Sequence, residues 1–191
     1  MATESEVMVR EGNLPPTAFQ TERLWLHAAR ADHAPGLFAD YTSDLEASRF
    51  LPRGPHRSQA KTLAVIDAWG ADRWTSNDRF AWSIIDRESD RPIGLFLLLM
   101  QGDGAEFHYG LGRGFWGQGL ATEAGKAVMF WVTGQSHLST IRTTCAATHG
   151  ASCRVLEKIG LVRDAFLPGA LLMKPRGERL NGWSYLWRRT D

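Results

Sequence analysis

The chain has 191 residues and carries 22 basic and 21 acidic side chains, so its formal net charge is +1. This length predicts one domain, and the balanced charge excludes the broad basic field that is typical of nucleic-acid-binding proteins. The longest apolar run, residues 93–100, is shorter than the roughly 20 residues that span a bilayer. The acidic start of the chain lacks the apolar segment of a secretory signal. We therefore expect a cytoplasmic protein with neither a nucleic-acid partner nor a membrane partner.

The N-terminal third of the chain contains a tail, a strand and two helices. Residues 1–18 are polar and end in a Leu-Pro-Pro sequence, which predicts a flexible tail before a single domain at residues 19–191. The predicted strand and the two predicted helices lie at residues 23–27, 32–41 and 58–69. Asp32 is placed to cap the first of these helices, and Pro35 fits its first turn.

The middle of the chain changes to strands joined by short polar turns. These strands are predicted at residues 79–86, 92–100 and 105–111, and their close succession indicates an antiparallel meander. A glycine-rich stretch at residues 110–119 then leads into a long amphipathic helix that begins at Leu120.

The remaining elements complete an α/β pattern. They are a strand at 139–145, a helix at 151–159 that ends at Gly160, and strands at 161–166, 170–173 and 183–187. This order predicts a central mixed sheet with an antiparallel meander, one parallel β-α-β crossover and helices on both faces. Cys145 and Cys153 do not form a CxxC pair, so we expect neither a disulfide framework nor a metal site.

The glycine-rich stretch has the composition of a phosphate-binding loop, because small residues expose backbone amides at the start of a helix. A plain flexible turn is the alternative interpretation. Gly112, Gly114 and Gly117 also match the GxGxxG pattern of dinucleotide-binding enzymes. That fold requires a β-α-β unit whose next strand ends near an acidic residue. Here a meander precedes the loop and the next strand ends in Cys-Ala-Ala-Thr (145–148), so a dinucleotide-binding oxidoreductase is the weaker alternative.

Two motifs together resemble one family. The sequence Trp-Gly-Gln-Gly-Leu-Ala-Thr-Glu-Ala at residues 116–124 looks like the pyrophosphate-binding motif of the GNAT acetyltransferases, and it most resembles the branch that includes the ribosomal-protein N-terminal acetyltransferases. Residues 152–161 are similar to the next helix of that branch. Residues 21–24 and 49–52 are similar to its opening segment. The resemblance covers about residues 20–190 and implies a GNAT-like fold.

The resemblance implies an N-acyltransferase that uses acetyl-CoA as co-substrate. It implies direct transfer of the acetyl group to a primary amine, which is either a protein N-terminus or a small molecule. By the same resemblance, the backbone of residues 117–121 holds the pyrophosphate. The implied cofactor-binding residues are Leu111, Arg113, Gly117, Gln118, Gly119, Leu120, Ala121 and Ser152.

Four residues are candidates for catalysis. Ser152, at the start of its helix, is placed by the resemblance to donate a hydrogen bond to the departing thiolate. His149 is a candidate base, or else a hydrogen-bonding residue or helix cap. Glu106 and His108 share one face of their strand and are candidates for deprotonating the amine through water. Cys153 lacks a recognisable His–Asp partner set, which favours direct transfer over a covalent intermediate.

The chain departs from the family pattern at three places. Gly114 stands where a Gln or Arg is usual, His149 stands where an Asn is common, and no acidic residue is found near Leu171. The last two departures, His149 and the missing acidic residue, keep open a catalytically inactive acyl-CoA-binding protein as an alternative. The closing strands also suggest a homodimer.

Overall fold

The computed structural model describes residues 14–76 and 78–190, in which eight strands form one mixed sheet. The strand order is β1-β2-β3-β4-β5-β6-β8-β7. The strands are β1 Ala18–Gln20, β2 Leu24–Ala28, β3 Arg79–Asp86, β4 Arg91–Gln101, β5 Gly104–Leu111, β6 Thr140–Ala146, β7 Val162–Met173 and β8 Glu178–Arg188. The predicted α/β class is confirmed.

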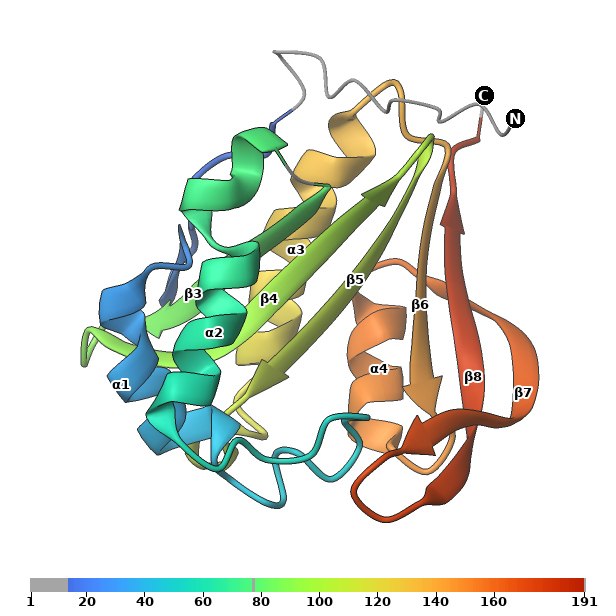
Figure 1. Cartoon of the computed structure of the whole chain (residues 1–191). Coiled ribbons are helices and arrows are strands. Elements are labelled where there is room, and N and C mark those ends of the chain that lie inside the picture. The colour runs from blue at the N-terminus through green and yellow to red at the C-terminus, as the bar shows by residue number, and fades with distance from the viewer. Residues whose placement is uncertain (1–13, 77, 191) are drawn as a thin grey trace, which may run out of the picture.

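Helices cover both faces of this sheet, as predicted (Figure 1). The helical elements are the 3-10 turn η1 Ala31–His33, α1 Ala34–Leu37, the π-helical turn η2 Phe38–Thr42, α2 Gln59–Trp69, the 3-10 turns η3 Ala71–Ser76 and η4 Arg113–Phe115, α3 Leu120–Gly134, and α4 Gly150–Lys158. Figure 1 shows α1 and α2 in front of β3 and β4, with α3 behind them. None of the helices in the described ranges is long and apolar enough to span a membrane.

Strand alternation divides the buried side chains between two cores, because successive residues of a strand point to opposite faces. Phe80, Trp82 and Ile84 of β3 belong to the core that includes Leu120, Ala124 and Val128 of α3. Ala81, between them, belongs to the core formed with Leu37 of α1 and Ile66 of α2. The sheet therefore separates an α3–α4 side from an α1–α2 side.

The expected meander and crossover are both present. β3, β4 and β5 are successive antiparallel neighbours, and β5 is joined through α3 to its parallel neighbour β6. The parallel pairing covers only residues 104–106 of β5 and 140–142 of β6. Beyond these residues the two strands diverge, so the second half of β5 has a free edge on the β6 side.

Two predicted elements differ from the structure in their extent. The helix expected at 32–41 is divided into η1, α1 and η2, and its N-terminal cap is not Asp32, because Arg30 and His33 precede η1 and α1. Pro35 does lie in the first turn of α1. A Cβ atom on Gly36 would lie 2.8 Å from Pro92 of β4, so close packing on the sheet leaves this segment little freedom to form one regular helix.

The strands expected at 161–166 and 170–173 are one continuous edge strand, β7. Its register against β8 shifts between Leu167 and Leu171. The intervening Pro168 and Gly169, which suggested a turn, instead lie at this irregularity, and proline is tolerated at bulges of edge strands. Large apolar side chains on β7 are exposed, but the homodimer stays a prediction.

The last residues of the expected tail are bound to the sheet. Ala18 begins β1, the carbonyl of Thr17 accepts a hydrogen bond from the amide of Ala28 (2.7 Å), and the carbonyl of Pro16 accepts one from Trp82 Nε1 (2.9 Å). Residues 16–18 are thus attached to the sheet, whereas the flexible tail stays a prediction, because residues 1–13 lie outside the described part of the chain.

Candidate active site

The loop between β5 and α3 presents a row of free backbone amides. Within the described part of the chain, the N–H groups of residues 117–122 have no hydrogen-bond acceptor, and the first paired amide is that of Glu123, which donates to Gly119 O at 3.0 Å. Residues 116–119 are exposed to solvent. Six consecutive amides at the N-terminus of a 15-residue helix are suited to binding an anion, because the N–H groups and the helix dipole both favour negative charge.

The glycines of this stretch have two different roles. Gly117 and Gly119 have φ angles of +76° and +80°, a left-handed conformation that other L-residues rarely adopt. Gly110 and Gly112 instead permit close packing, since a Cβ atom on either would overlap Tyr41 or the carbonyl of Asp40. The glycine-rich composition therefore reflects both a turn with left-handed residues and tight contact between β5 and η2.

Side chains close the loop without using the free amides. Trp116 Nε1 donates to the carbonyl of Leu111 (2.9 Å), and Gln118 Nε2 donates to the carbonyl of Gly114 (3.1 Å). Arg113, an expected phosphate ligand, lies 3.9 Å from Asp44 and is 63% exposed. Of the expected cofactor-binding side chains, those of Leu111 and Leu120 are buried and only their backbone atoms are available.

An ion pair that was not anticipated holds the loop to the start of the sheet. The Arg23 side chain contacts Oε2 of Glu123 through Nε at 2.8 Å and Nη2 at 2.6 Å, and its Nη1 donates to the carbonyl of Gln118 at 3.0 Å. The backbone amide of Arg23 donates to the other carboxylate oxygen, Oε1, at 2.8 Å. The Thr21 hydroxyl donates to the same carboxylate at 2.6 Å. Burial raises the pKa of Glu123, but the hydrogen bonds from Thr21 and Arg23 outweigh it and hold that pKa below its usual value. Glu123 thus stays ionised and fixes the first turn of α3.

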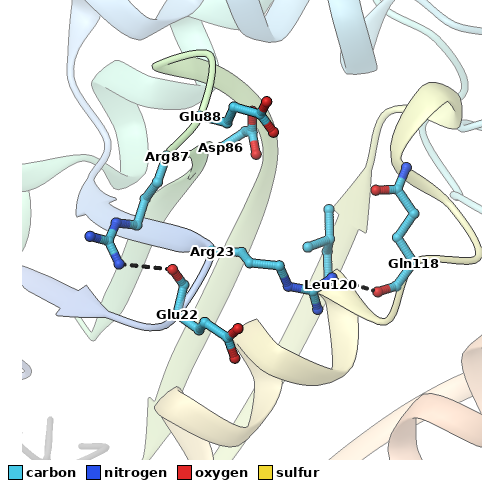
Figure 2. A pocket seen from close by; sticks show the side chains of 7 residues that line it. All are labelled: Glu22, Arg23, Asp86, Arg87, Glu88, Gln118 and Leu120. Carbon is cyan, nitrogen blue, oxygen red and sulfur yellow. Dashed lines mark hydrogen bonds between the residues drawn. The ribbon is translucent and has the colours of Figure 1, made fainter.

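Two surface hollows adjoin the loop. One, of about 330 Å³, is shown in Figure 2, where Arg23 points to the carbonyl of Gln118. Its three carboxylates, Glu22, Asp86 and Glu88, make it a poor site for a phosphate. The other hollow, of about 590 Å³, is lined by Glu22, Gly119, Thr122, Glu123, Lys126 and Lys158. Since Glu123 is paired with Arg23, Lys126 and Lys158 outnumber the remaining carboxylate, Glu22, and give this second hollow a positive charge that suits phosphate.

Ser152 and Tyr109 meet at the point where β5 and β6 diverge. The Tyr109 hydroxyl lies 2.9 Å from Ser152 Oγ, with either atom able to donate. Burial raises the pKa of Tyr109, so its phenol keeps its proton over the physiological range. Thr143 Oγ1 donates to the carbonyl of Phe107 (2.7 Å), so the odd-numbered residues of β5 direct their backbone groups toward β6. By that alternation the amides of Tyr109 and Leu111 face the open edge.

The two cysteines also lie near Ser152. Cys145 and Cys153 are free and buried, with their Sγ atoms 3.7 Å apart. Burial raises the pKa of the Cys145 thiol to about 12, so it is protonated at neutral pH and is a weak nucleophile. This geometry gives no support to a covalent intermediate.

Glu106 and His108 form a pair on the opposite side of β5. His108 Nε2 lies 3.0 Å from Glu106 Oε1, and this hydrogen bond is the main reason that the pKa of Glu106 is lowered. Ala105 and Phe107 of the same strand belong to the α3 core, whereas Gly110 contacts Tyr41 on the α1–α2 side. The pair therefore faces the α1–α2 side, away from the ring of Tyr109.

His149 lies at the N-terminus of α4, but its side chain does not cap the helix. His149 occupies the N-cap position of α4, but its side chain makes no capping hydrogen bond. The imidazole instead stacks on Phe50, with ring centroids 4.2 Å apart. Burial, with a smaller contribution from Arg49, lowers the pKa of His149, so the imidazole is neutral at neutral pH. The N-cap position is therefore as expected, but a side-chain cap is absent, and the roles of base and hydrogen-bonding residue stay predictions. Within the described residues, no cluster of His, Cys, Asp or Glu is suited to a metal ion.

Comparisons with known proteins agree with this geometry. Residues 23–162 match the acetyltransferase (GNAT) domain. The uncharacterized N-acetyltransferase p20 of Bacillus licheniformis is 30% identical over 152 residues, which cover 75% of this chain and 84% of that protein. The chain belongs to the GNAT acetyltransferase family, whose members transfer acetyl groups from acetyl-CoA, and the predicted membership is confirmed.

Solved structures show the same fold at lower identity. The microcin C7 self-immunity acetyltransferase MccE, in complex with acetyl-CoA and AMP, has a TM-score of 0.78 at 14% identity, covering 92% of this chain and 98% of that chain. A ribosomal L7/L12 alpha-N-protein acetyltransferase, in complex with coenzyme A, has a TM-score of 0.73 at 17% identity, covering 91% and 96%.

Proposed function

We propose that this protein transfers the acetyl group of acetyl-CoA directly to a primary amine, on a protein N-terminus or on a small molecule. The observation that carries the proposal is the row of six free amides at residues 117–122, because no partner in the described chain uses them. They fit the diphosphate of coenzyme A. Lys126 and Lys158, in the adjoining hollow, would pair with a further phosphate of the same molecule.

The free edge of β5 would hold the thioester. The pantetheine arm, which has amide groups of its own, would extend the sheet beyond the last β5–β6 pair. The amide of Tyr109 or Leu111 would then donate to the acetyl oxygen and stabilise the negative charge that develops on it when the amine attacks. Leu111 thus acts through its backbone.

Ser152 and Tyr109 would assist departure of the thiolate. When the tetrahedral intermediate collapses, the C–S bond breaks and the sulfur carries the negative charge. The Ser152 hydroxyl would donate a hydrogen bond to this sulfur, and the Tyr109 phenol would donate to Ser152 Oγ and keep the serine oriented. The thiolate then takes up one proton, which completes coenzyme A.

The amine must lose two protons to become the amide, one of them before it can attack. We assign the Glu106–His108 pair to this task, because it is partly exposed and faces the α1–α2 side of β5, opposite the thioester. His149 is neutral and close to Ser152 in sequence, and its contact with Phe50 suggests that it positions the acceptor segment. We treat it as the second candidate base.

The two alternative functions, a dinucleotide-dependent oxidoreductase and an inactive acyl-CoA-binding protein, explain fewer of the observed contacts. A dinucleotide enzyme would need the loop in a Rossmann β-α-β unit, but β5 is the third strand of an antiparallel meander. An inactive acyl-CoA-binding protein would not require the Tyr109–Ser152 contact. We also place the protein in the cytoplasm.

The test is release of free thiol from acetyl-CoA in the presence of a panel of amines, with mass spectrometry of the acetylated product. The proposal predicts amine-dependent thiol release with stoichiometric acetylation. Tight binding of acetyl-CoA without acetylation of any amine would favour the inactive binding protein instead.

A further inference from the structure

The side of the active site that faces α1 and α2 is strongly basic. Residues 44–61 and 174–179 carry seven basic and three acidic side chains, although the whole chain has a net charge of only +1. These two segments are distant in sequence but pack together. The Lys174 amide donates to the carbonyl of Pro52 (3.2 Å), and Arg176 Nη2 donates to the carbonyl of Arg49 (3.1 Å). We call the surface they form the basic rim.

The basic rim adjoins the proposed transfer centre at two points. Phe50 stacks on His149, three residues before Ser152 in α4. The guanidinium of Arg53 lies over the ring of Tyr41, 5.9 Å from its centroid, and the Tyr41 hydroxyl abuts Gly110 of β5. Arg49 and Arg53 therefore flank the place where an amine would approach the thioester from the α1–α2 side.

The charges of the basic rim are only partly neutralised by the protein. Glu46 lies 3.9 Å from Arg49, and Glu178 lies 3.0 Å from Arg176. Across the described ranges, neither Arg53 nor Lys174 has a carboxylate within ion-pair distance. An acceptor that carries negative charge would supply the missing partners.

The positive charges of the basic rim also contribute to the lowered pKa values of two histidines. Burial, together with the smaller effects of the charges of Arg53 and Lys61, lowers the pKa of His56 to about 4. Burial and the charge of Arg49 likewise lower the pKa of His149. In the described part of the chain, the buried side-chain atoms without a hydrogen-bond partner are Ser48 Oγ and His56 Nε2, and both belong to this segment. The segment therefore has unused polar groups as well as excess positive charge.

We propose that the acceptor is a peptide N-terminus followed by acidic residues, and that Arg49, Arg53 and Lys174 bind its carboxylates. This inference rests on the proposed acetyl transfer and names its substrate class. A peptide fits better than a small anionic amine because the cations are exposed and spread over two segments; Arg49, for example, is 60% exposed. Cationic acceptors would be repelled by the same surface.

The experiment compares two peptides with the same N-terminal residue, one continued by Asp and Glu and the other by Lys. Values of kcat/KM would be measured by thiol release for the wild type, for the triple variant Arg49→Gln, Arg53→Gln, Lys174→Gln, and for Arg188→Gln. Arg188 is an exposed arginine at the far end of β8 from residues 174–177, so it is a control for removal of positive charge.

The expected result is a preference of about tenfold or more for the acidic peptide, which falls toward unity in the triple variant and at high salt. The Arg188→Gln variant keeps the preference, and all three proteins bind acetyl-CoA equally. Equal rates for the two peptides, an unchanged preference in the triple variant, or a higher kcat/KM for a small anionic amine such as aspartate would overturn the inference.

The inference stays testable if no amine is acetylated. Fluorescence anisotropy of labelled acidic and basic peptides on the acetyl-CoA-loaded protein reports binding without turnover. Selective binding of the acidic peptide, lost in the triple variant, would support the acceptor class while the absence of turnover contradicts acetyl transfer. Equal binding of the two peptides would contradict the acceptor class alone.

Discussion

The donor side and the acceptor side of β5 are built in different ways. On the donor side, the proposed phosphate-binding loop is one short stretch, and the groups that would bind the phosphate are the backbone amides of residues 117–122. On the acceptor side, the basic rim combines side chains from a loop before α2 and from the β7–β8 turn, more than 100 residues apart in the chain. A backbone site depends on conformation, whereas a side-chain site depends on which charged groups meet. The two sides should therefore respond to different substitutions.

The largest expected effect is a loss of kcat, and it is expected for residues between the two sides, where the departing thiolate would lie. Ser152→Ala should lower kcat by about 100-fold with little change in the acetyl-CoA dissociation constant, because the lost hydrogen bond forms with the departing sulfur. Tyr109→Phe should have a smaller effect in the same direction. Steady-state kinetics and titration calorimetry separate the two parameters.

Cys153→Ala, next to Ser152, is the matched control and should retain the wild-type kcat. An unchanged kcat in Ser152→Ala would remove this residue from the mechanism. A large loss in Cys153→Ala, in a protein that remains folded by circular dichroism, would reopen the covalent pathway.

The next effect tests whether the donor site depends on conformation. Gly119→Ala should weaken acetyl-CoA binding by about 5- to 30-fold, because a left-handed conformation costs an L-residue roughly 1–2 kcal/mol. An added Cβ there meets nothing closer than Arg23 Nη2 at 3.8 Å, so crowding within the protein contributes little.

Gly102→Ala is the control, since Gly102 also has a positive φ (+62°) in open space but lies in the β4–β5 turn, away from the loop. Gly102→Ala should lose stability in thermal unfolding and keep the wild-type affinity. Gly119→Ala should lose affinity, because an exposed free loop can relax out of the left-handed conformation and must return to it when the cofactor binds. Equal affinities in calorimetry would show that the loop conformation does not hold the cofactor.

The same contrast between a contiguous site and a site made from distant segments explains which features could be predicted from the sequence. The positions of the loop at 117–121 and of Ser152 at helix starts could be predicted because each lies in a contiguous motif, while their roles in binding and catalysis stay predictions. The meander and the crossover followed from strand alternation and turn composition. Tyr109 was missed as a side chain, although its alternation with Phe107 and Leu111 places it on the α3–α4 side.

Contacts between distant segments could not be predicted in this way. The Arg23–Glu123 pair joins residues 100 positions apart, and no local pattern marks such a contact. The division of residues 31–42 into three helical pieces depends on packing against β4, which is likewise a tertiary effect. Residues 49–52 resembled a family segment, but only their contact with the β7–β8 turn gave them a role.

A moderate effect on stability tests the ion pair beneath the loop. Arg23→Gln should lower the free energy of unfolding by about 1–2 kcal/mol, as hydrogen bonds to a charged group do, with a discount for the partial exposure of Arg23. The control Arg30→Gln breaks an exposed pair with Asp32 and should change stability little. Denaturant titrations measure both.

The pH dependence of this difference has a definite sign. Because the folded-state pKa of Glu123 is lowered, its stabilisation is complete above the unfolded-state pKa and is lost as pH falls through the folded-state value. The gap between wild type and Arg23→Gln should therefore close in acid. A gap that is constant from neutral to acidic pH would exclude the ionised carboxylate as its cause.

The smallest expected effect is a shift in the pH dependence of kcat/KM, and it tests the proposed base. The hydrogen bond from His108 is the main cause of the lowered pKa of Glu106, so His108→Ala should raise that pKa. The acidic limb of the kcat/KM profile should then move to higher pH, and Glu106→Gln should abolish that limb. A profile unchanged by both substitutions would exclude the pair, and His149→Ala would then be the next variant to measure.

The most direct test of acetyl-CoA use is calorimetric titration of the purified wild-type protein with acetyl-CoA, with NAD and FAD as controls. The free amides of residues 117–122 and the free edge of β5, which fits the amide-bearing pantetheine arm, together predict saturable binding of acetyl-CoA at micromolar concentration or below, and no heat from either dinucleotide. Absence of binding to acetyl-CoA, together with binding of NAD or FAD, would contradict the assignment of the loop to coenzyme A.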